Sequence, residues 1–294
     1  VAGGRIHDVE VMPGNPEMLF IASASGGIWK STNKGTTWKP VFDNEAVSTF
    51  GDIAISKSNT NILYVGTGEQ QNRQSSSWGN GVYKSTDQGE TWQSIGLEKT
   101  FHISKVIVHP ANSNIVYVGA LGNLWKESED RGIYKTTNGG NSWSQTAIGD
   151  SRIQQIIAAP SDFNIQYAAV NGIGVLKSID AGSSWSNPGG IGLGGTVSYD
   201  NADGILGGGG GGNFARLELA VSHQNPDIVY AGIDGNAASY LKVSYDGGVV
   251  WNQLNNDDNS ADDWLYPQGW FDNTITVNPY NDSIVYYAGR DASK

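Results

Sequence analysis

The stretch Ser85–Trp92, which reads S-T-D-Q-G-E-T-W, decides the fold because it is one copy of a motif that recurs along the chain. The motif is S/T-x-D/N-x-G-x-x-W, and its five copies begin at Ser31, Ser85, Thr136, Ser178 and Ser244, at intervals of 42 to 66 residues. Four fixed positions that recur together at near-regular spacing indicate a fold made of repeated units.

Each copy carries the chemistry of a tight turn. An Asp or Asn side chain can accept hydrogen bonds from backbone N–H groups further along a turn. The Gly supplies a positive φ, and the Trp begins the next strand and packs its ring under the hairpin. We therefore interpret the motif as structural. Its acid or amide positions are Asn33, Asp87, Asn138, Asp180 and Asp246, and its Trp positions are Trp38, Trp92, Trp143, Trp185 and Trp251.

The segments around each motif predict four strands per repeat. Alternating apolar residues, as in "DIAISKSNTNILYVGT" from Asp52 to Thr67, are typical of two half-buried strands joined by a turn. A third strand leads into the motif, as in "GVYKST", and a fourth follows the Trp. Repeated four-stranded antiparallel sheets predict an all-β fold, a β-propeller. The expected blades are residues 5–44, 50–97, 102–147, 152–188, 215–255 and 272–294.

The last of these repeats is incomplete. It begins with "NTITVNPYNDSIVYYAG" at Asn273 and supplies two strands before the chain stops at Lys294. We expect five complete blades and a partial sixth, in one propeller domain spanning residues 1–294. The simplest interpretation is that this is a piece of a longer protein, whose other domains are candidate partners. A six-bladed ring closed by another element is the alternative.

Composition excludes several classes of partner. The formal net charge is −11, with 18 basic and 29 acidic residues and no cluster of Lys and Arg. Nucleic acid and anionic lipid are therefore unexpected partners. The chain has no apolar run of the roughly 18 residues that a membrane span needs, so we expect no membrane insertion. It has no cysteine, which excludes disulfides and thiolate metal sites.

The repeat sorts the loops by face. With strands counted outward from the axis, the first-to-second and third-to-fourth connections lie on one face, here called the lower face. The second-to-third and fourth-to-first connections lie on the opposite, upper face. The long insertions, residues 69–80, 122–131, 187–213 and 255–272, all fall on the upper face. Long loops on one face of a rigid scaffold usually carry binding, so we predict that the upper face is functional.

Aromatic and charged side chains of these loops are the candidate ligand-binding residues. An exposed Trp beside polar groups suits stacking on a sugar ring or a peptide, although each Trp could instead pack its loop onto its blade. The basic residues, with Arg5 and Lys126 nearby, could equally brace the loops through ion pairs. The candidates are Glu69, Arg73, Trp78, Trp125, Arg131, Arg152, Trp264, Trp270 and Asp272.

A second candidate site is a ring of polar residues on the innermost strands. Alignment of the six repeats places Asp8, Asp52, Lys105, Gln155, Glu218 and Thr274 at one equivalent position. We expect a polar ring at the channel mouth that could hold a ligand or a cation. The simpler interpretation is hydrated strand ends.

Longer stretches resemble a known family. "GRIHDVEV", "ASGGIWKSTNKGTTW" and "VGTGEQQNRQSSSWGNGVYKSTDQGETW" are similar to the Asp-box (bacterial neuraminidase repeat) propellers. They look most like the secreted sortilin-like and glycosyl-hydrolase-like repeat proteins of Bacteroidetes-type bacteria. The resemblance spans essentially the whole chain and implies a β-propeller that is secreted or displayed on a bacterial cell surface. It is less specific for activity, because one fold hosts many functions.

Two enzyme activities of that superfamily lack their expected residues here. The arginine motif near the start of sialidases is reduced to "GGRIHD". Xyloglucanase-type enzymes place a catalytic Asp where this chain has Ser25, and a hydroxyl cannot act as the general base of inverting hydrolysis. Those enzymes also use a second propeller. A different pair of carboxylates, such as Glu69 with Asp272 or Asp52 with Glu218, remains an alternative.

Two stretches suggest ligands without matching their motifs. The run Gly207–Gly212 lacks the Lys-Ser/Thr end and the following helix of a phosphate-binding loop. The stretch 255–263, "NNDDNSADD", resembles a calcium loop in charge but not in spacing or terminal Glu. We expect no cofactor, with calcium at this stretch as the alternative.

These observations favour a secreted or cell-surface module that binds a glycan or protein ligand through its upper loops. One alternative is a glycoside hydrolase whose carboxylates lie in loops that do not align. Another is a structural module of a large surface assembly.

Overall fold

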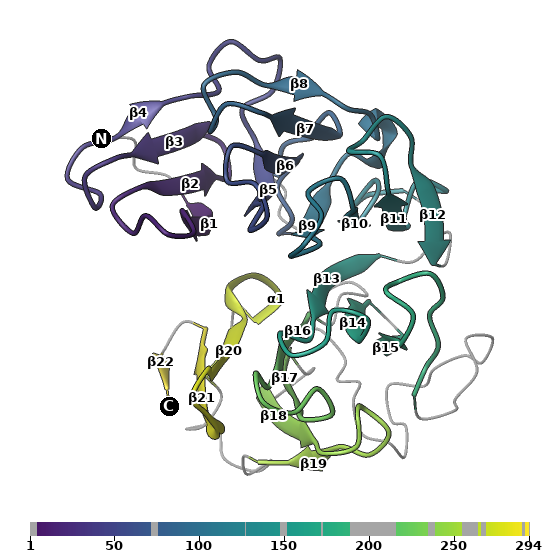
Figure 1. Ribbon diagram of the computed structural model, residues 1–294. Helices are drawn as coiled ribbons and strands as arrows, with labels where there is room; N and C mark the ends of the chain where they lie inside the picture. The colour runs from purple at the N-terminus through teal and green to yellow at the C-terminus, as the bar shows by residue number, and fades with distance from the viewer. Residues whose placement is uncertain are drawn as a thin grey trace. The chain divides into compact units, whose positions relative to one another are not determined.

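The computed structural model describes residues 5–71, 76–126, 128–147, 152–171, 173–188, 216–234, 239–254, 264–265, 269–289 and 292–293. In these residues the chain consists of short antiparallel strands, with one 3-10 turn at Glu98–Thr100 and one helical turn, α1 (Gly269–Asp272) (Figure 1). It divides into two compact units, unit 1 (Val1–Ile153) and unit 2 (Gln154–Lys294). No helix in the described ranges is long and apolar enough to cross a membrane.

Unit 1 contains three four-stranded sheets, blades 1 to 3, each an up-and-down meander in sequence order. Blade 1 comprises β1 (Ile6–Val11), β2 (Leu19–Ser23), β3 (Ile28–Ser31) and β4 (Lys39–Pro40). Blade 2 comprises β5 (Phe50–Ile55), β6 (Leu63–Thr67), β7 (Val82–Ser85) and β8 (Gln93–Ser94). Blade 3 comprises β9 (Ile103–Val108), β10 (Val116–Ala120), β11 (Gly132–Thr136) and β12 (Ser144–Ala147).

The repeat continues with blades 4 to 6. Blade 4 has β13 (Ile153–Ala158), β14 (Gln166–Val170) and β15 (Gly174–Ser178), with a single bridge from Lys177 to Ser186 where a fourth strand is expected. Blade 5 has β16 (Leu217–Val221), β17 (Val229–Asp234), β18 (Ser239–Ser244) and β19 (Asn252–Gln253). Blade 6 has β20 (Thr274–Asn278), β21 (Asn281–Ala288) and β22 (Ala292–Ser293), one strand more than predicted. The all-β class and the four-stranded sheets are confirmed, whereas the single domain and the closure of the ring stay predictions.

The motif turns are held by their first and third residues. In Ser85–Trp92 the Asp87 Oδ1 atom accepts hydrogen bonds from the Ser85 hydroxyl at 2.8 Å and from the backbone N–H of Thr91 at 2.9 Å. The Thr91 hydroxyl donates to Asp87 Oδ2 at 2.6 Å. Where the motif has Asn138, the amide nitrogen instead donates to the Ser142 hydroxyl at 2.9 Å. An amide therefore replaces the carboxylate by reversing one hydrogen bond.

Two motif Trp residues reach back to the preceding blade. The indole N–H of Trp92 donates to the carbonyl oxygen of Val41 at 2.9 Å, and that of Trp143 donates to Ile95 at 2.8 Å. Each acceptor follows the outermost strand of the previous sheet. The motif therefore ties neighbouring blades together as well as closing its own turn.

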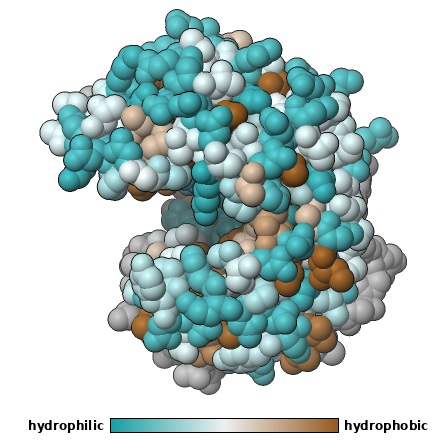
Figure 2. Space-filling model, in the orientation of Figure 1, coloured by the Kyte–Doolittle hydropathy of each residue, from teal (hydrophilic) through white to brown (hydrophobic). Residues whose placement is uncertain are grey.

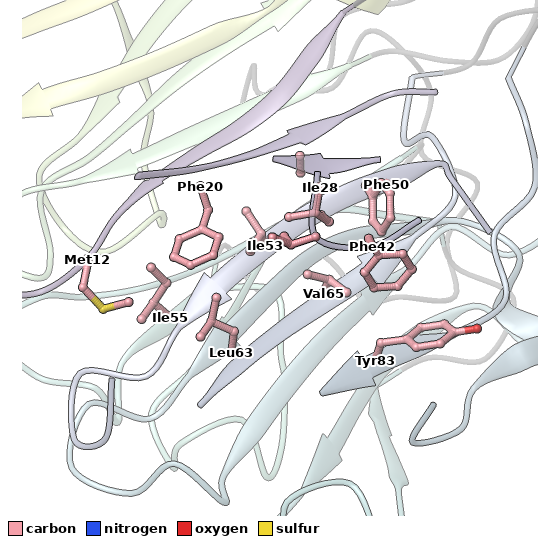
Figure 3. Close-up of a cluster of buried hydrophobic side chains, with 12 residues drawn as sticks. Met12, Phe20, Ile28, Phe42, Phe50, Ile53, Ile55, Leu63, Val65 and Tyr83 are labelled. Carbon is pink, nitrogen blue, oxygen red and sulfur yellow. The ribbon is translucent and has the colours of Figure 1, made fainter. Parts of the chain in front are cut away.

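The core lies between neighbouring sheets. Figure 3 shows the cluster between blades 1 and 2, where Phe20 and Ile28 face Ile53 and Val65. Similar clusters lie between blades 2 and 3, 4 and 5, and 5 and 6. The side seen in Figure 2 is largely hydrophilic, with scattered hydrophobic residues. Burial between sheets, rather than within one sheet, supplies the hydrophobic stabilisation of each unit.

Candidate functional site

The candidate site lies at the upper end of unit 1, where two long loops leave neighbouring blades. Residues 68–81 connect β6 to β7 in blade 2, and residues 121–131 connect β10 to β11 in blade 3 (Figure 1). Because the strands alternate in direction, the beginnings of β1, β5 and β9 lie at the same end as these loops. Side chains just before or at the start of those strands can therefore contact the loops.

Trp78 presents an exposed ring on a fixed backbone. Its side chain is 56% exposed and contacts Phe101 edge to face, with ring centroids 5.4 Å apart. The carbonyl oxygen of Trp78 accepts a hydrogen bond from the Thr49 hydroxyl at 3.1 Å. The next residue, Gly79, donates its N–H to the carbonyl oxygen of Phe101 at 2.7 Å. The indole is thus oriented by its neighbours while most of its surface stays in water.

Trp125 is the second exposed indole, at 48%. The side chain of Asn123 accepts hydrogen bonds from the N–H groups of Trp125 at 2.9 Å and Lys126 at 3.2 Å. Arg131, which is almost fully buried, donates to the carbonyl oxygens of Leu121 at 3.1 Å, Asn123 at 2.9 Å and Lys126 at 2.5 Å. The guanidinium therefore fixes three backbone carbonyl oxygens of this loop relative to one another.

Arg152, which immediately precedes β13, contacts the same loop. Its Nη2 atom donates to the carbonyl oxygen of Leu124 at 3.3 Å. Arg131 and Arg152 thus brace the Trp125 loop, as one of the two sequence interpretations has it, although through backbone carbonyls. The sequence could not tell whether these arginines brace the loop or contact a ligand, because a long cationic side chain can do either.

A short segment, Phe101 and His102, joins the two Trp-bearing loops. The imidazole of His102 is fully buried, and its Nδ1 atom donates to the carbonyl oxygen of Glu69 at 2.9 Å. The carbonyl oxygen of His102 accepts the N–H of Leu121 at 2.9 Å. Burial lowers the pKa of His102 to about 4, so the ring is neutral at pH 7. Phe101 has a φ of 56°, a costly value for a residue with a side chain.

Glu69 lies beneath these loops rather than on the surface. Its side chain is 1% exposed and pairs with the Arg5 guanidinium, and His7 Nε2 lies 3.9 Å from the same Oε1 atom. Burying a carboxylate is costly unless a cation and hydrogen bonds compensate it. The buried side chains of His7 and Glu69, together with the partly exposed Arg5, therefore form a polar cluster that anchors the start of the Trp78 loop to blade 1.

The polar ring residues make hydrogen bonds between blades. At three of the positions the side-chain oxygen accepts the N–H that follows the equivalent residue of the next blade. The pairs are Asp8 with Ile53 (3.3 Å), Asp52 with Val106 (2.7 Å), and Gln155 with Leu219 (2.6 Å). The polar residue at this position therefore links neighbouring blades, which its polarity in the sequence did not indicate.

In unit 1 the ring position places one lysine beside two carboxylates. Lys105 Nζ lies 2.5 Å from Asp52 Oδ1 and 4.0 Å from Asp8 Oδ2. Although burial acts to lower it, these carboxylates raise the pKa of Lys105 above its usual value. Burial, and next the Asp8 carboxylate, raise the pKa of Glu10 to about 7. In unit 2, Glu218 pairs with Arg216 at 2.6 Å and Thr274 is exposed.

Comparison with known proteins agrees with this repeat geometry. The family model described as "Sortilin-Vps10: Sortilin, neurotensin receptor 3" matches residues 26–159. The resemblance to Asp-box propellers is confirmed. An ancestral GH74 enzyme superposes on 99% of the chain with a TM-score of 0.71 at 19% identity, covering 36% of that enzyme. The GH74 enzyme of Niastella koreensis superposes on 98% with a TM-score of 0.66 at 20% identity, covering 44% of its chain. These likenesses establish a propeller-like fold.

Sequence relatives of this chain include xyloglucanases. Xyloglucanase Xgh74A of Acetivibrio thermocellus is 24% identical over 362 residues, which cover 97% of this chain and 39% of that protein. A xyloglucanase of Hypocrea jecorina is 23% identical over 241 residues, which cover 79% of this chain and 24% of that protein. The chain thus spans about two fifths or less of the length of the relatives it matches.

The other predicted site residues lie elsewhere in the structure or outside the described residues. Trp264 in unit 2 is almost buried and packs edge to face on Tyr287, with centroids 4.8 Å apart. Asp272 ends α1 and is half-buried. Arg73, the side chain of Trp270, the Gly207–Gly212 run and the 255–263 stretch lie outside the described residues. Among the residues that are described, no group of three or more His, Asp or Glu could hold a metal ion.

His7, Phe101 and His102 are site residues that the sequence did not single out. Each lies just before or within an innermost strand. Their importance comes from contacts with residues far away in the sequence, which the sequence pattern does not show. The one sequence signal is position, since His102 immediately precedes β9 at the upper end.

Proposed function

We propose that the upper loops of unit 1 bind a glycan of the xyloglucan type, with Trp78 and Trp125 as the stacking surfaces. The observation that carries this proposal is the exposure of both indoles on loops whose backbones are fixed by buried polar side chains. An exposed indole lacks the favourable free energy of burial that the same ring would have in the core. A ring held rigidly in water loses little conformational entropy when a sugar face covers it.

The xyloglucanase relatives support the choice of polysaccharide. These relatives are named as enzymes that act on xyloglucan, and the propeller-like fold is shared with GH74 enzymes. Sugar rings present apolar C–H faces that stack on flat aromatic side chains, while their hydroxyls suit polar loop groups. An extended polymer could contact both loops, because Phe101 and His102 join them.

Binding is favoured over hydrolysis by the contacts of Glu69 and Asp52, the two carboxylates of unit 1 that the sequence offered as catalytic candidates. Glu69 is buried against Arg5, and Asp52 accepts hydrogen bonds from Lys105 and Val106. A hydrolase needs a carboxyl group free to hold or give up a proton beside the glycosidic oxygen. At the position where xyloglucanases are expected to carry an acid, the exposed residue is Ser25. Polymeric glycan is met outside the cell, so the proposal also implies a secreted or cell-surface protein.

The test is affinity electrophoresis and calorimetry with xyloglucan, with cellulose and mannan polymers as comparisons. Trp78→Ala and Trp125→Ala should each weaken binding about tenfold, the scale of a buried aromatic anchor. The matched control is Tyr245→Ala, because Tyr245 is an equally exposed aromatic, 59%, on a motif turn. Affinity should be unchanged in that variant.

Two outcomes contradict the proposal. If no polysaccharide binds, the glycan proposal fails. If the wild-type chain releases reducing ends from xyloglucan, and a carboxylate variant abolishes that release, the chain is a hydrolase and not a binding module.

A further inference from the structure

The connection between β8 and β9 in unit 1 carries backbone strain next to the Trp78 loop. In the described part of the chain, the residues other than glycine that have a positive φ outside the motif turns are Leu97 and Phe101. They flank the 3-10 turn Glu98–Thr100. Such values are costly for a residue with a side chain, and they persist only where the surrounding structure holds them. The contacts of this connection should therefore explain the strain.

Phe101 is the central residue of a γ-turn. Its φ is 56° and its ψ is −49°, and the N–H of His102 donates to the carbonyl oxygen of Thr100 at 2.5 Å. A γ-turn with a positive φ at its centre is rare and strained. Leu97 has a φ of 63° and a ψ of 30°, which is the ordinary left-handed helical conformation. Phe101 is thus the more strained of the two residues.

The γ-turn brings the backbone of Phe101 against the base of the Trp78 loop. The carbonyl oxygen of Phe101 accepts the N–H of Gly79 at 2.7 Å, and a Cβ atom on Gly68 would lie 2.0 Å from the same oxygen. The base of the loop is closed by a hydrogen bond from the N–H of Glu69 to the carbonyl oxygen of Ser77 at 3.3 Å. Backbone atoms of the loop and of the turn therefore contact each other directly, with a glycine on the loop side.

The side chain of Phe101 contacts the indole of Trp78. The two ring planes are inclined at 65° and their centroids are 5.4 Å apart, which is an edge-to-face arrangement. Hydrogen bonds at the carbonyl oxygen of Trp78 and the N–H of Gly79 fix the main chain on this side of the loop. They do not fix the side-chain torsions of Trp78, which is 56% exposed. The contact with the Phe101 ring restrains those torsions.

We propose that Phe101 is a positioning residue for ligand binding, whose strained backbone directs its ring against Trp78 and so fixes the orientation of the exposed indole. A glycine at this position would relieve the strain but supply no ring. An indole that is already ordered loses less conformational entropy when a ligand covers it, so the strain is offset by affinity. The inference rests on the proposed function for its affinity measurement, whereas the orientation of the indole is measured without ligand.

The ligand-free test uses fluorine NMR of the full chain labelled with fluorotryptophan, in which Trp78→Phe identifies the Trp78 signal by its disappearance. Phe101→Leu keeps a large side chain but removes the ring, so it should shift the Trp78 signal and leave the other tryptophan signals in place. Phe101→Tyr keeps the ring and should leave the Trp78 signal near its wild-type position. Circular dichroism checks that each variant folds. A Trp78 signal that does not move in Phe101→Leu overturns the proposal.

The matched control is Leu97→Ala. Leu97 lies at the other end of the same turn and packs against the core cluster between blades 2 and 3. Its replacement should lower the melting temperature without shifting the Trp78 signal. An equal shift of that signal in Leu97→Ala and Phe101→Leu would mean that any disturbance of the turn moves the indole, and would overturn a specific role for the Phe101 ring.

The affinity test measures xyloglucan binding in two backgrounds. Phe101→Leu should weaken binding about threefold to tenfold, the scale of one aromatic pair. In the Trp78→Ala background the same substitution should have no further effect, because Phe101 acts through the indole. Equal weakening in both backgrounds would mean that Phe101 contacts the ligand itself, and would overturn the positioning role. If xyloglucan does not bind at all, the proposed function fails, and the fluorine signal still decides the role of Phe101.

A pair of variants separates the strain from the ring. Phe101→Gly and Phe101→Ala both remove the ring, but only glycine adopts a positive φ at little cost. Phe101→Gly should therefore melt at a higher temperature than Phe101→Ala, and both should shift the Trp78 signal. A glycine variant that melts at or below the temperature of the alanine variant would contradict the strained turn, and with it the proposal.

Discussion

The Nδ1 atom of His102 lies 2.9 Å from the carbonyl oxygen of Glu69, and this hydrogen bond joins blade 3 to the Trp78 loop of blade 2. A carbonyl oxygen only accepts, so the imidazole proton is on Nδ1. The opposite atom, Nε2, is buried without a hydrogen-bond partner in the described part of the chain. Protonating the ring would place a charge where water does not reach it, and this loss of hydration is the physical reason for the low pKa.

His102 should make folding pH-dependent. Its pKa is lowered from 6.5 to about 4, so between these values the unfolded chain binds a proton that the folded chain does not. Stability is therefore lost as pH falls from 6.5 towards 4, by an amount on the order of 3 kcal/mol. Urea unfolding at pH 7 and pH 4 measures the loss. His102→Gln, which does not titrate, should lose less stability over the same interval. An equal loss in both proteins would contradict this assignment.

Arg131 should determine the conformation of the Trp125 loop. Arg131→Lys keeps the charge but cannot donate to three carbonyl oxygens in fixed directions. Buried carbonyls left without a donor cost about 1 to 3 kcal/mol each, so we expect a total loss of about 3 kcal/mol or less after the loop relaxes. Thermal unfolding measures the loss, and acrylamide quenching measures Trp125 exposure.

The matched control for Arg131 is Arg152→Lys. Arg152 donates to the carbonyl oxygen of Leu124 in the same loop at the longer distance of 3.3 Å, so its replacement should have a smaller effect on both measurements. Equal effects of the two substitutions would mean that the three carbonyl bonds of Arg131 do not hold the loop.

Asp180 should tolerate an amide but not a methyl group. Its carboxylate accepts the hydroxyl and N–H of Ser184, at 2.6 and 2.9 Å, and Asn138 shows that an amide can occupy the equivalent place. We expect Asp180→Asn to lower the melting temperature less than Asp180→Ala does.

The same site adds a second pH effect, at lower pH. The Ser184 hydroxyl and N–H bonds lower the pKa of Asp180 to about 2, so its contribution is present above the usual pKa of 3.8 and is lost as pH falls towards 2. Asp180→Asn should lack this loss, and the reverse substitution Asn138→Asp should gain one. Melting curves at pH 5 and pH 2.5 compare the three proteins. Identical pH dependence in all three would contradict the turn assignment.

The repeat and its turns were predictable from sequence because their interactions are local. Asp87 contacts residues two and four positions away, so the spacing of the motif carries the information. The candidate site depends on contacts between distant residues instead. Glu69 pairs with Arg5, 64 positions away, and nothing near Glu69 in sequence shows that it is buried. Trp78 and Trp264 read alike in sequence, yet one ring is exposed and the other is covered by Tyr287.

Asp52 should stabilise the junction of blades 2 and 3 through two separable contacts. Its Oδ2 atom accepts the N–H of Val106 at 2.7 Å, and its Oδ1 atom pairs with Lys105. Asp52→Asn keeps an oxygen for Val106, as Gln155 does for Leu219 in unit 2, but removes the charge beside Lys105. Asp52→Ala removes both contacts. We expect the free energy of unfolding to fall by about 1 kcal/mol for Asn and about 3 kcal/mol for Ala, because the alanine leaves the buried N–H of Val106 without its acceptor and the Lys105 ammonium without its nearer carboxylate.

The free energy of unfolding in urea, measured for the Asp52 variants with and without Lys105→Met, gives a double-mutant cycle. The ion pair should appear as a coupling between the two positions. The Val106 bond should appear as the difference between Asn and Ala that persists when Lys105 is replaced. If Asn and Ala are equally destabilising in that background, the backbone bond contributes nothing, and the ring position stabilises the junction through charge alone.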